Sequence, residues 1–203
     1  MIGPEMNDAV APVMRAFLEL GVEYYFGGSI ASSTLGISRA TNDADLVADF
    51  RSIHTAPFIQ RLASDFYVSE SAIRSAIERR SCFNVIHLKA AFKVDVFVLK
   101  DRPFDEIAMS RRQFQSLFLG HTEVHGPVAS AEDIVLAKLE WFRKGGEVSD
   151  RQWTDIKTVL QVQSASIDLD YLWHWSREIN VDDLLLRVLA DAGLPPPNQS
   201  VPF

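Results

Sequence analysis

Two hydrophobic patterns follow one another along the chain and change near residue 126. Before that point, alternating stretches and short apolar runs typical of strands are interspersed with segments whose apolar residues recur every three or four positions, as in amphipathic helices. After it, only the helical spacing recurs. The patterns therefore predict an α+β domain at residues 1–126 and an α-helical domain at residues 127–203.

The first domain is expected to open with a helix over residues 6–20, in which Pro12 should cause a kink or move the start. Residues 82–88 and 91–99 read as strands with only two residues between them, so we expect an antiparallel hairpin. The other expected helices are one that the Gly27-Gly28-Ser29 turn opens and that runs through about residue 35, then 55–65 and 104–109, while 71–79 is expected to be a polar helix or arm. The other expected strands are 22–26, 44–50, 66–68, 113–119 and 121–128.

The second domain is expected to contain helices only. Acidic residues follow Ser130 directly, as in the first turn of a capped helix. The expected helices are 132–144, 149–163, 169–179 and 182–192, and three consecutive prolines begin a tail that we expect to be disordered from about residue 195.

Asp43 and Asp45 stand one residue apart at the start of the strand expected at 44–50. Side chains two positions apart on a strand share a face, so the two carboxylates should be close neighbours. Like charges at that distance repel each other unless a cation lies between them, and a divalent cation with oxygen ligands is the simplest solution. Asp95 lies within an apolar strand, where an unpaired charge is unfavourable. If the two strands are neighbours, Asp95 completes a three-carboxylate site for Mg²⁺ or Mn²⁺.

A Gly27-Gly28-Ser29 turn precedes the carboxylates and has the character of a phosphate-binding turn. Glycines let the backbone approach an anion, the amides at a helix start bind it, and the serine adds a hydroxyl. Arg39 and Thr41, just before the first carboxylate, are candidates for contacts with the same phosphates. The turn and the acids together indicate a site for a triphosphate with its metal.

Two other readings of these motifs are disfavoured. The stretch from Gly28 to Gly36 is not a P-loop, because no Gly-Lys-Ser/Thr follows it. The Asp43-x-Asp45 pair resembles that of haloacid-dehalogenase-type phosphatases, but those enzymes need a hydrophobic strand before the first aspartate. Here the preceding residues are polar and the apolar run comes afterwards.

Composition indicates which partners and which cellular compartment to expect. The 203 residues carry a formal net charge of -7, which argues against strong general binding of nucleic acid. The single cysteine, Cys82, excludes an intrachain disulfide and favours a reducing compartment. The first residues do not read as a signal peptide, and every apolar run is shorter than the roughly 18 residues of a membrane span. We therefore expect a cytoplasmic protein without a membrane segment.

These motifs resemble the nucleotidyltransferase (polymerase-β-like) superfamily: Gly27-Gly28-Ser29, then Arg39-x-Thr41-x-Asp43-x-Asp45, then Lys93-x-Asp95. The AbiEii-type toxin branch and its stand-alone relatives are the most similar members. Downstream, Lys138 and the pair Asp150 and Asp155 resemble that branch's lysine and aspartate motifs, so the resemblance covers about residues 22–160.

The resemblance implies a nucleotidyltransferase fold, with a mixed sheet flanked by helices, and transfer of an NMP from an NTP to an acceptor hydroxyl. It assigns Mg²⁺ or Mn²⁺ to Asp43, Asp45 and Asp95. The residues that it assigns to the nucleotide are Gly27, Gly28, Ser29, Arg39, Thr41 and Lys138, and those that it places nearby are Lys93, Asp150 and Asp155.

The acceptor stays open among tRNA, protein and small molecules, and a toxin-like role would bring an antitoxin as a partner. The alternative is a catalytically silent nucleotide-binding protein with a regulatory or toxin–antitoxin role.

Overall fold

The computed structural model describes residues 4–197, and the chain divides into two compact units. Unit 1 comprises Met1–Ile30 and Ala40–Val128, and unit 2 comprises Ala31–Arg39 and Ala129–Phe203. Unit 2 thus includes a short segment, residues 31–39, that hydrophobic patterning alone does not separate from its neighbours. Residues 198–203 of the tail that we expect to be disordered lie outside the described residues.

Unit 1 is built on a mixed seven-stranded sheet, which confirms the expected α+β class. Its strands are β1 (Tyr24–Phe26), β2 (Asp43–Ala48), β3 (Phe66–Val68), β4 (Cys82–His87), β5 (Phe92–Val98), β6 (Gln113–Leu119) and β7 (Thr122–Val128). The order across the sheet is β3-β4-β5-β2-β1-β7-β6. β2 runs parallel to β5 and β1 parallel to β7, while the remaining neighbours are antiparallel, including the expected β4–β5 hairpin.

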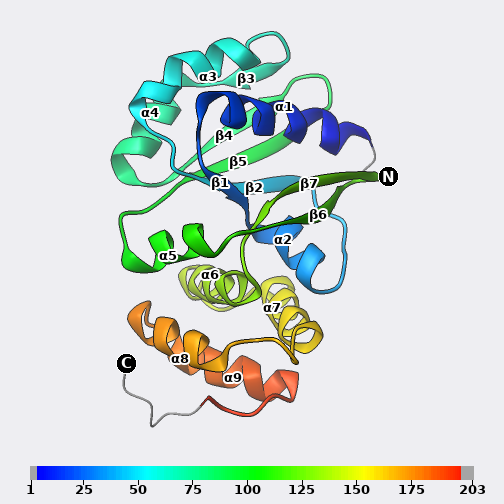
Figure 1. The fold of residues 1–203 in the computed structure, drawn as a ribbon, viewed down its shortest axis with the longest axis vertical. Coiled ribbons are helices and arrows are strands. Elements are labelled where there is room, and N and C mark those ends of the chain that lie inside the picture. Colours follow the sequence, from blue (N-terminus) through cyan, green and yellow to red (C-terminus); the bar gives the residue numbers. More distant parts are fainter. Residues whose placement is uncertain (1–3, 198–203) are drawn as a thin grey trace. The chain divides into compact units, whose positions relative to one another are not determined.

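Helices α1, α3 and α4 cover one face of this sheet (Figure 1). The helices of unit 1 are α1 (Pro4–Leu20), the 3-10 turn η1 (Ser52–His54), α3 (Thr55–Leu62), α4 (Glu70–Arg79) and α5 (Pro103–Arg111), and α2 (Gly28–Leu35) begins in unit 1. α1 continues through Pro12 and starts two residues before the expected position.

The covered face of the sheet is apolar because alternate residues of each strand point to it. On β2 these are Ala44, Leu46 and Ala48, all fully buried. Five aromatic rings pack together on this side, from α1, β1, α3, β4 and the segment after β2: Phe17, Tyr24, Phe50, Phe58 and Phe83. The other face of β2 therefore carries Asp43 and Asp45.

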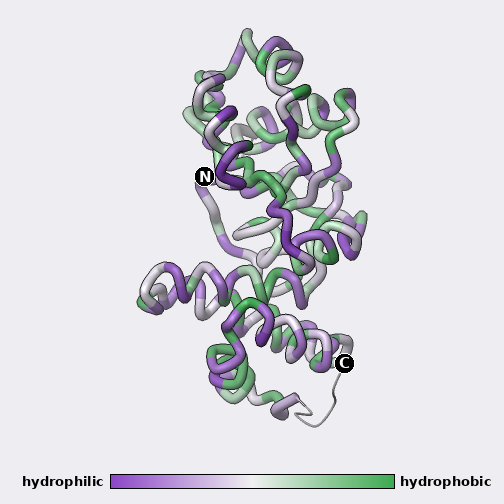
Figure 2. Tube along the Cα trace, turned by 90° about the vertical axis from the view of Figure 1, so that its left-hand side faces the viewer, coloured by the Kyte–Doolittle hydropathy of each residue, from purple (hydrophilic) through white to green (hydrophobic). Residues whose placement is uncertain are grey.

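Unit 2 contains four further helices, α6 (Ala131–Lys144), α7 (Asp150–Val162), α8 (Leu169–Glu178) and α9 (Asp182–Ala192), close to the expected bounds. Side chains of Ser130, Ser149 and Asp168 accept hydrogen bonds from backbone amides at three of the helix starts. Along these helices the tube in Figure 2 alternates between hydrophilic and hydrophobic segments, as expected for helices with one buried face.

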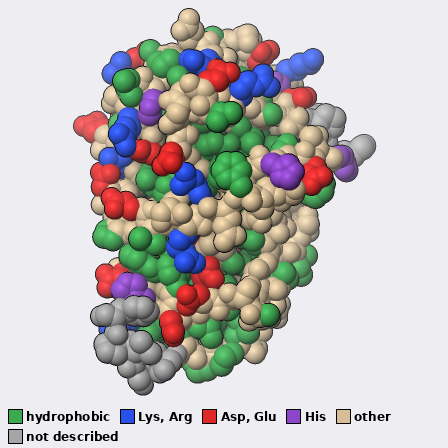
Figure 3. All heavy atoms as spheres, in the orientation of Figure 1, with side chains coloured by type: hydrophobic (Ala, Val, Ile, Leu, Met, Phe, Trp, Pro, Cys, Tyr) green, Lys and Arg blue, Asp and Glu red, His purple; other side chains and the backbone are tan. Residues whose placement is uncertain are grey.

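Charges of both signs are interspersed on the face of the molecule drawn in Figure 3. Within residues 4–197, no helix is both long enough and apolar enough to cross a membrane.

The aromatic packing predicts very different effects for two adjacent substitutions on α1. Phe17 is fully buried among three other rings, whereas Leu18 is 79% exposed. Phe17→Ala should lower the free energy of unfolding by about 3–5 kcal/mol, since it removes a core ring and leaves a cavity. Leu18→Ala should change it by less than about 0.5 kcal/mol. Urea denaturation measures both, and equal losses would contradict this packing.

Candidate active site

The three aspartates predicted from the sequence lie on one face of two adjacent parallel strands. Residues 43, 45 and 47 of β2 are half-buried while residues 44, 46 and 48 are buried, so Asp43 and Asp45 point away from the core. In the β2–β5 register, Asp45 lies beside Asp95 and Asp43 beside Lys93. The condition set by the sequence, that the two strands be neighbours, is therefore met.

Two neighbours hold the carboxylate of Asp95, which is 8% exposed. Lys93 Nζ lies 2.6 Å from Oδ2, and Asn84 donates a short hydrogen bond from Nδ2 to Oδ1. The hydrogen bond to Asp95 raises the pKa of Lys93, although the partial burial of this lysine opposes the shift. Both oxygens of Asp95 are thus engaged by protein donors.

Asn84 is a site residue that the sequence reasoning missed. It lies on β4 directly across from Asp95. The signal was present, because a hairpin centred between Lys89 and Ala90 must oppose these two positions. An amide in that register supplies a donor to the buried acid.

Asp43 is oriented by Thr41, which the sequence assigned to phosphate. The Thr41 hydroxyl is buried and donates to Asp43 Oδ1 at 2.9 Å. It also lies 3.2 Å from the backbone oxygen of Asp43. Thr41 therefore fixes the first carboxylate where the chain enters β2.

The Asp45 side chain lies against the glycine turn. A Cβ placed on Gly28 would lie 1.7 Å from Asp45 Oδ2, and Gly28 has a φ of +48°. Gly27 has room, since a Cβ there would lie 3.8 Å from Val47, and its N–H donates to the Asp45 carbonyl at 2.9 Å. A glycine is thus required at position 28, because there is no room for a side chain and because the φ angle is positive. α2 therefore starts beside the carboxylate of Asp45, although its own first turn contains no acidic residue.

The carboxylates of this face also act on a neighbouring thiol. Cys82 lies on the same face of β4 as Asn84. Burial, reinforced by the charges of Asp95 and Asp45, raises the pKa of the Cys82 thiol to about 12, while the charge of Lys93 opposes the shift. The thiol of Cys82 is therefore held in its neutral form.

Only some of the side chains on this face are suitable ligands for a hard divalent cation. Asp43 and Asp45 offer carboxylate oxygens of the kind that Mg²⁺ and Mn²⁺ take. Among residues 4–197, however, no group of three or more His, Cys, Asp or Glu side chains is arranged to hold a metal ion. Asp95 faces Lys93 and Asn84 instead, so the pair on β2 is the part of the expected triad that fits a metal.

A second cluster of predicted residues lies in unit 2. Asp155 on α7 accepts two hydrogen bonds from Arg39, Nε to Oδ1 and Nη2 to Oδ2, each 2.8 Å long. Lys138 on α6 donates to Oδ2 at 2.9 Å. The side chains of Asp155 and Lys138 are each 8% exposed and that of Arg39 is 26% exposed. Three groups that the sequence placed near nucleotide therefore form one ion cluster with a formal charge of +1.

The cluster determines the protonation of Asp155. Burial alone would raise the pKa of its carboxyl, but the hydrogen bond from Arg39 and the charge of Lys138 outweigh burial and lower it. Asp150 is not part of this cluster, since it is exposed at the first position of α7. Ser29 lies in the first turn of α2.

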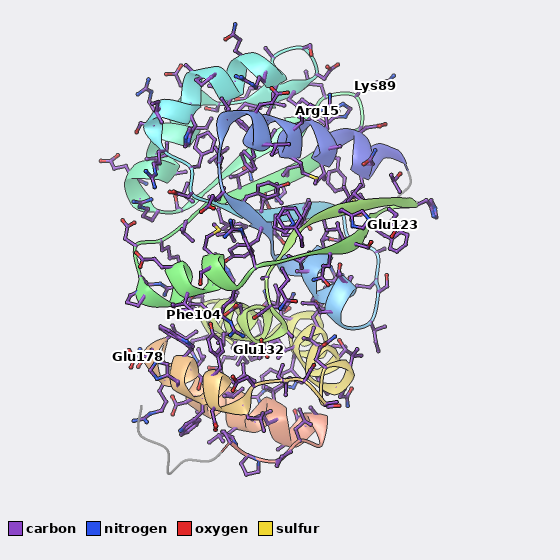
Figure 4. All side chains as sticks on the ribbon, in the orientation of Figure 1. Arg15, Lys89, Phe104, Glu123, Glu132 and Glu178 are labelled. Carbon is purple, nitrogen blue, oxygen red and sulfur yellow. The ribbon has the colours of Figure 1, made fainter. Side chains whose placement is uncertain are left out.

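At the start of α6, two buried acids hold this helix to the start of α8. Figure 4 labels Glu132 on α6, whose Oε1 accepts the backbone N–H of Asp168 at 3.0 Å. Its neighbour Asp133 accepts hydroxyl hydrogen bonds from Tyr171 at 2.6 Å and from Ser130 at 2.7 Å. These partners account for the burial of both acids.

No protein-family model matches the sequence, and no curated protein matches it. Solved structures do match the fold. An antigenic nucleotidyltransferase-like protein from Paracoccidioides brasiliensis superposes with a TM-score of 0.58 at 17% identity, covering 95% of this chain and 93% of that chain. The solution structure of the antibiotic-resistance factor ANT(2'')-Ia gives a TM-score of 0.52 at 11% identity, covering 95% and 96%. The chain therefore has a nucleotidyltransferase-like fold.

The contact between Gly28 and Asp45 predicts an ordering among three glycine substitutions. Gly21→Ala introduces a side chain at a positive φ of 65° in open space, and should destabilise the protein by about 1 kcal/mol. Gly28→Ala adds a clash with the carboxylate, and should exceed that loss by about 1–3 kcal/mol. Gly27→Ala should have the smallest effect of the three. Thermal and urea unfolding rank them, and a Gly28→Ala effect equal to that of Gly21→Ala would contradict the contact.

The ion cluster predicts a pH-dependent loss in Asp155→Asn. Removing one partner of a buried ion pair should lower the free energy of unfolding by about 3 kcal/mol at pH 7. Because the folded pKa of Asp155 is depressed, its contribution is complete above the usual aspartate value of about 3.9 and declines as pH falls through the folded value. The difference between parent and variant should therefore shrink in acid.

Asp150→Asn, on the same helix but exposed, is the matched control and should change stability by less than about 1 kcal/mol. A difference between parent and Asp155→Asn that stays constant from pH 7 to pH 2 would show that the charge of Asp155 is not what stabilises the cluster.

Proposed function

We propose that this protein transfers a nucleotidyl group from an NTP to an acceptor hydroxyl and releases pyrophosphate. The observation that carries the proposal is the register of β2 and β5, which brings Asp45 beside Asp95 and keeps Asp43 on the same face. The nucleotidyltransferase-like fold supports it, as does the glycine turn against Asp45.

A divalent metal belongs to this proposal because of charge. The carboxylate of Asp45 lies against the same turn that we assign to the phosphates. A triphosphate brought there alone would meet like charge, whereas its magnesium complex would not. Mg²⁺ or Mn²⁺ bound through Asp43 and Asp45 would neutralise the phosphates and lower the pKa of the acceptor hydroxyl.

The chain's own groups have distinct tasks in this scheme. Thr41 orients Asp43 through its hydroxyl. Asn84 and Lys93 orient Asp95, which either accepts the proton of the acceptor hydroxyl or becomes a third metal ligand. The amide of Gly28 and the hydroxyl of Ser29 bind phosphate oxygens, while Gly27, whose N–H donates to the Asp45 carbonyl, holds the turn against β2 and lets the backbone approach the phosphates.

Arg39 and Lys138 supply positive charge to the nucleotide in this proposal, as the resemblance implies. Asp155 then acts as a positioning residue, because it holds both cations while the cluster keeps a formal charge of +1. Asp150 is left with the ordinary role of an acid at a helix start.

The contacts of Asp95 favour a second candidate function. Both oxygens of Asp95 are engaged by Lys93 and Asn84, and the described residues contain no three-ligand metal group. A site in this state would bind a nucleotide through Asp43 and Asp45 without transferring it. The alternative is therefore a catalytically silent nucleotide-binding regulatory protein or toxin–antitoxin component.

The acceptor and the family branch are finer proposals. We assign the chain to the AbiEii-type branch on the Lys138 and Asp155 motifs, which favours tRNA or protein as the acceptor and an antitoxin as a partner. The neighbour ANT(2'')-Ia is described as an antibiotic-resistance factor, which adds small-molecule antibiotics to the acceptors worth testing.

Transfer of label from α-labelled NTPs tests the activity. The protein and Mg²⁺ are incubated separately with total tRNA, with a protein extract and with a set of small-molecule antibiotics. Asp45→Asn and Asp43→Asn should each lower the transfer rate by roughly 100-fold or more, since each removes a group that stabilises charge in the transition state. Asp49→Asn is the matched control because Asp49 directly follows β2 and pairs with Arg51.

Binding of the magnesium complex, measured by calorimetry, separates the two candidates. Transfer that Asp45→Asn abolishes supports the enzyme. Tight binding that Asp45→Asn weakens, with no transfer to any acceptor, supports the silent binder. Binding that neither carboxylate variant changes would contradict this placement of the metal.

A further inference from the structure

The sheet of unit 1 ends at β6, a strand without the usual protection of an edge. β6 has β7 as its only neighbour in the described sheet. Its sequence, Gln113–Leu119, contains no charged residue and no proline. Natural edge strands normally carry such residues because unpaired backbone groups would otherwise pair with another chain.

Two phenylalanines of β6 are exposed on the same face. Phe114 is 78% exposed and Phe118 is 64% exposed, whereas Leu117 and Leu119 on the opposite face are buried. Figure 4 labels Glu123 on the neighbouring strand β7, which pairs with Phe118 at the outer end of this hairpin. Large aromatic side chains exposed in this way on an edge are typical of contact surfaces.

The hairpin register shows which backbone groups of β6 face outward. Leu119 and Thr122 close a two-residue turn at Gly120 and His121, so they exchange hydrogen bonds with each other. Alternation along the strand then directs the N–H and C=O groups of residues 118, 116 and 114 away from β7. The residues with outward backbone groups are thus the two exposed phenylalanines and Ser116 between them.

We propose that β6 is a self-association surface that pairs antiparallel with β6 of a second copy about a two-fold axis at Ser116. This register opposes Ser116 to its own counterpart and each Phe114 to the partner copy's Phe118. It uses every outward-facing backbone group of the three residues. A two-fold axis at residue 115 would instead oppose Phe118 to Arg112, and one at residue 117 would oppose Phe114 to Gly120, so only the axis at Ser116 pairs phenylalanine with phenylalanine.

Charge and area both point to a second copy as the occupant. The register opposes Arg112 to Gly120, so no two like charges meet along the strand, despite the net charge of -7 on each chain. Each buried phenylalanine contributes roughly 150–250 Å², so four rings provide at most about 600–1,000 Å², which is less than the roughly 1,200 Å² or more of a stable interface. The dimer should therefore be weak and dependent on concentration. This inference uses unit 1 alone and does not rest on the proposed function.

Site-directed cross-linking tests the register. In a Cys82→Ser background, Ser116→Cys should form an intermolecular disulfide on mild oxidation, because opposed residues of antiparallel strands lie at a suitable Cα distance of about 5.5 Å. A mixture of Phe114→Cys and Phe118→Cys proteins should cross-link to each other more than either does alone. Gln115→Cys, on the opposite face, should not cross-link. Self-linking of Phe114→Cys above the mixture would overturn the antiparallel pairing.

Sedimentation velocity over a range of concentrations tests the association itself. Phe114→Lys and Phe118→Lys should each raise the dimer dissociation constant at least tenfold, with the melting temperature unchanged because both side chains are exposed. Tyr67→Lys is the matched control, since Tyr67 is 58% exposed on β3 at the other edge of the sheet. A monomer at every concentration, or a shift with Tyr67→Lys alone, would overturn the proposal.

Discussion

The side chain of Asp45 can lie where it does because residue 28 has no Cβ. Its Oδ2 occupies the space that any other side chain at that position would need. This contact ties the start of α2 to the strand that carries the carboxylates, and the β2–β5 register then adds Asp95. The candidate site is therefore the consequence of one close approach and one strand pairing, both within unit 1.

In unit 2, by contrast, the predicted site residues are held together by ion pairs between buried charged groups. Arg39, Lys138 and Asp155 reach one another from three separate segments, and their mutual hydrogen bonds offset the loss of hydration. Asp155 thereby holds Arg39 and Lys138 beside each other, which suits the proposal that both cations contact phosphate.

Much of this arrangement follows from local sequence. Strand periodicity placed Asp43 and Asp45 on one face, and the two-residue gap after residue 88 set the hairpin that opposes Asn84 to Asp95. The partners of the buried charges could not be derived in this way. Arg39 and Asp155 are 116 positions apart, and no periodicity links two such segments. The engagement of Asp95 by Lys93, by contrast, follows from the same strand periodicity that pairs Asp43 with Asp45, since side chains two positions apart on a strand share a face.

The central position of β2 has a consequence for how the site comes into existence. β2 pairs with β5 through residues 50 positions further along the chain, as in Asp43 beside Lys93, and β1 reaches β7 across 102 positions, from Phe26 to Val128. Pairings of such long range slow folding, because loop closure must precede them. A fragment that stops before β5 cannot contain the carboxylate face. Occupancy of the site by a ligand would accordingly report that β2 and β5 have paired.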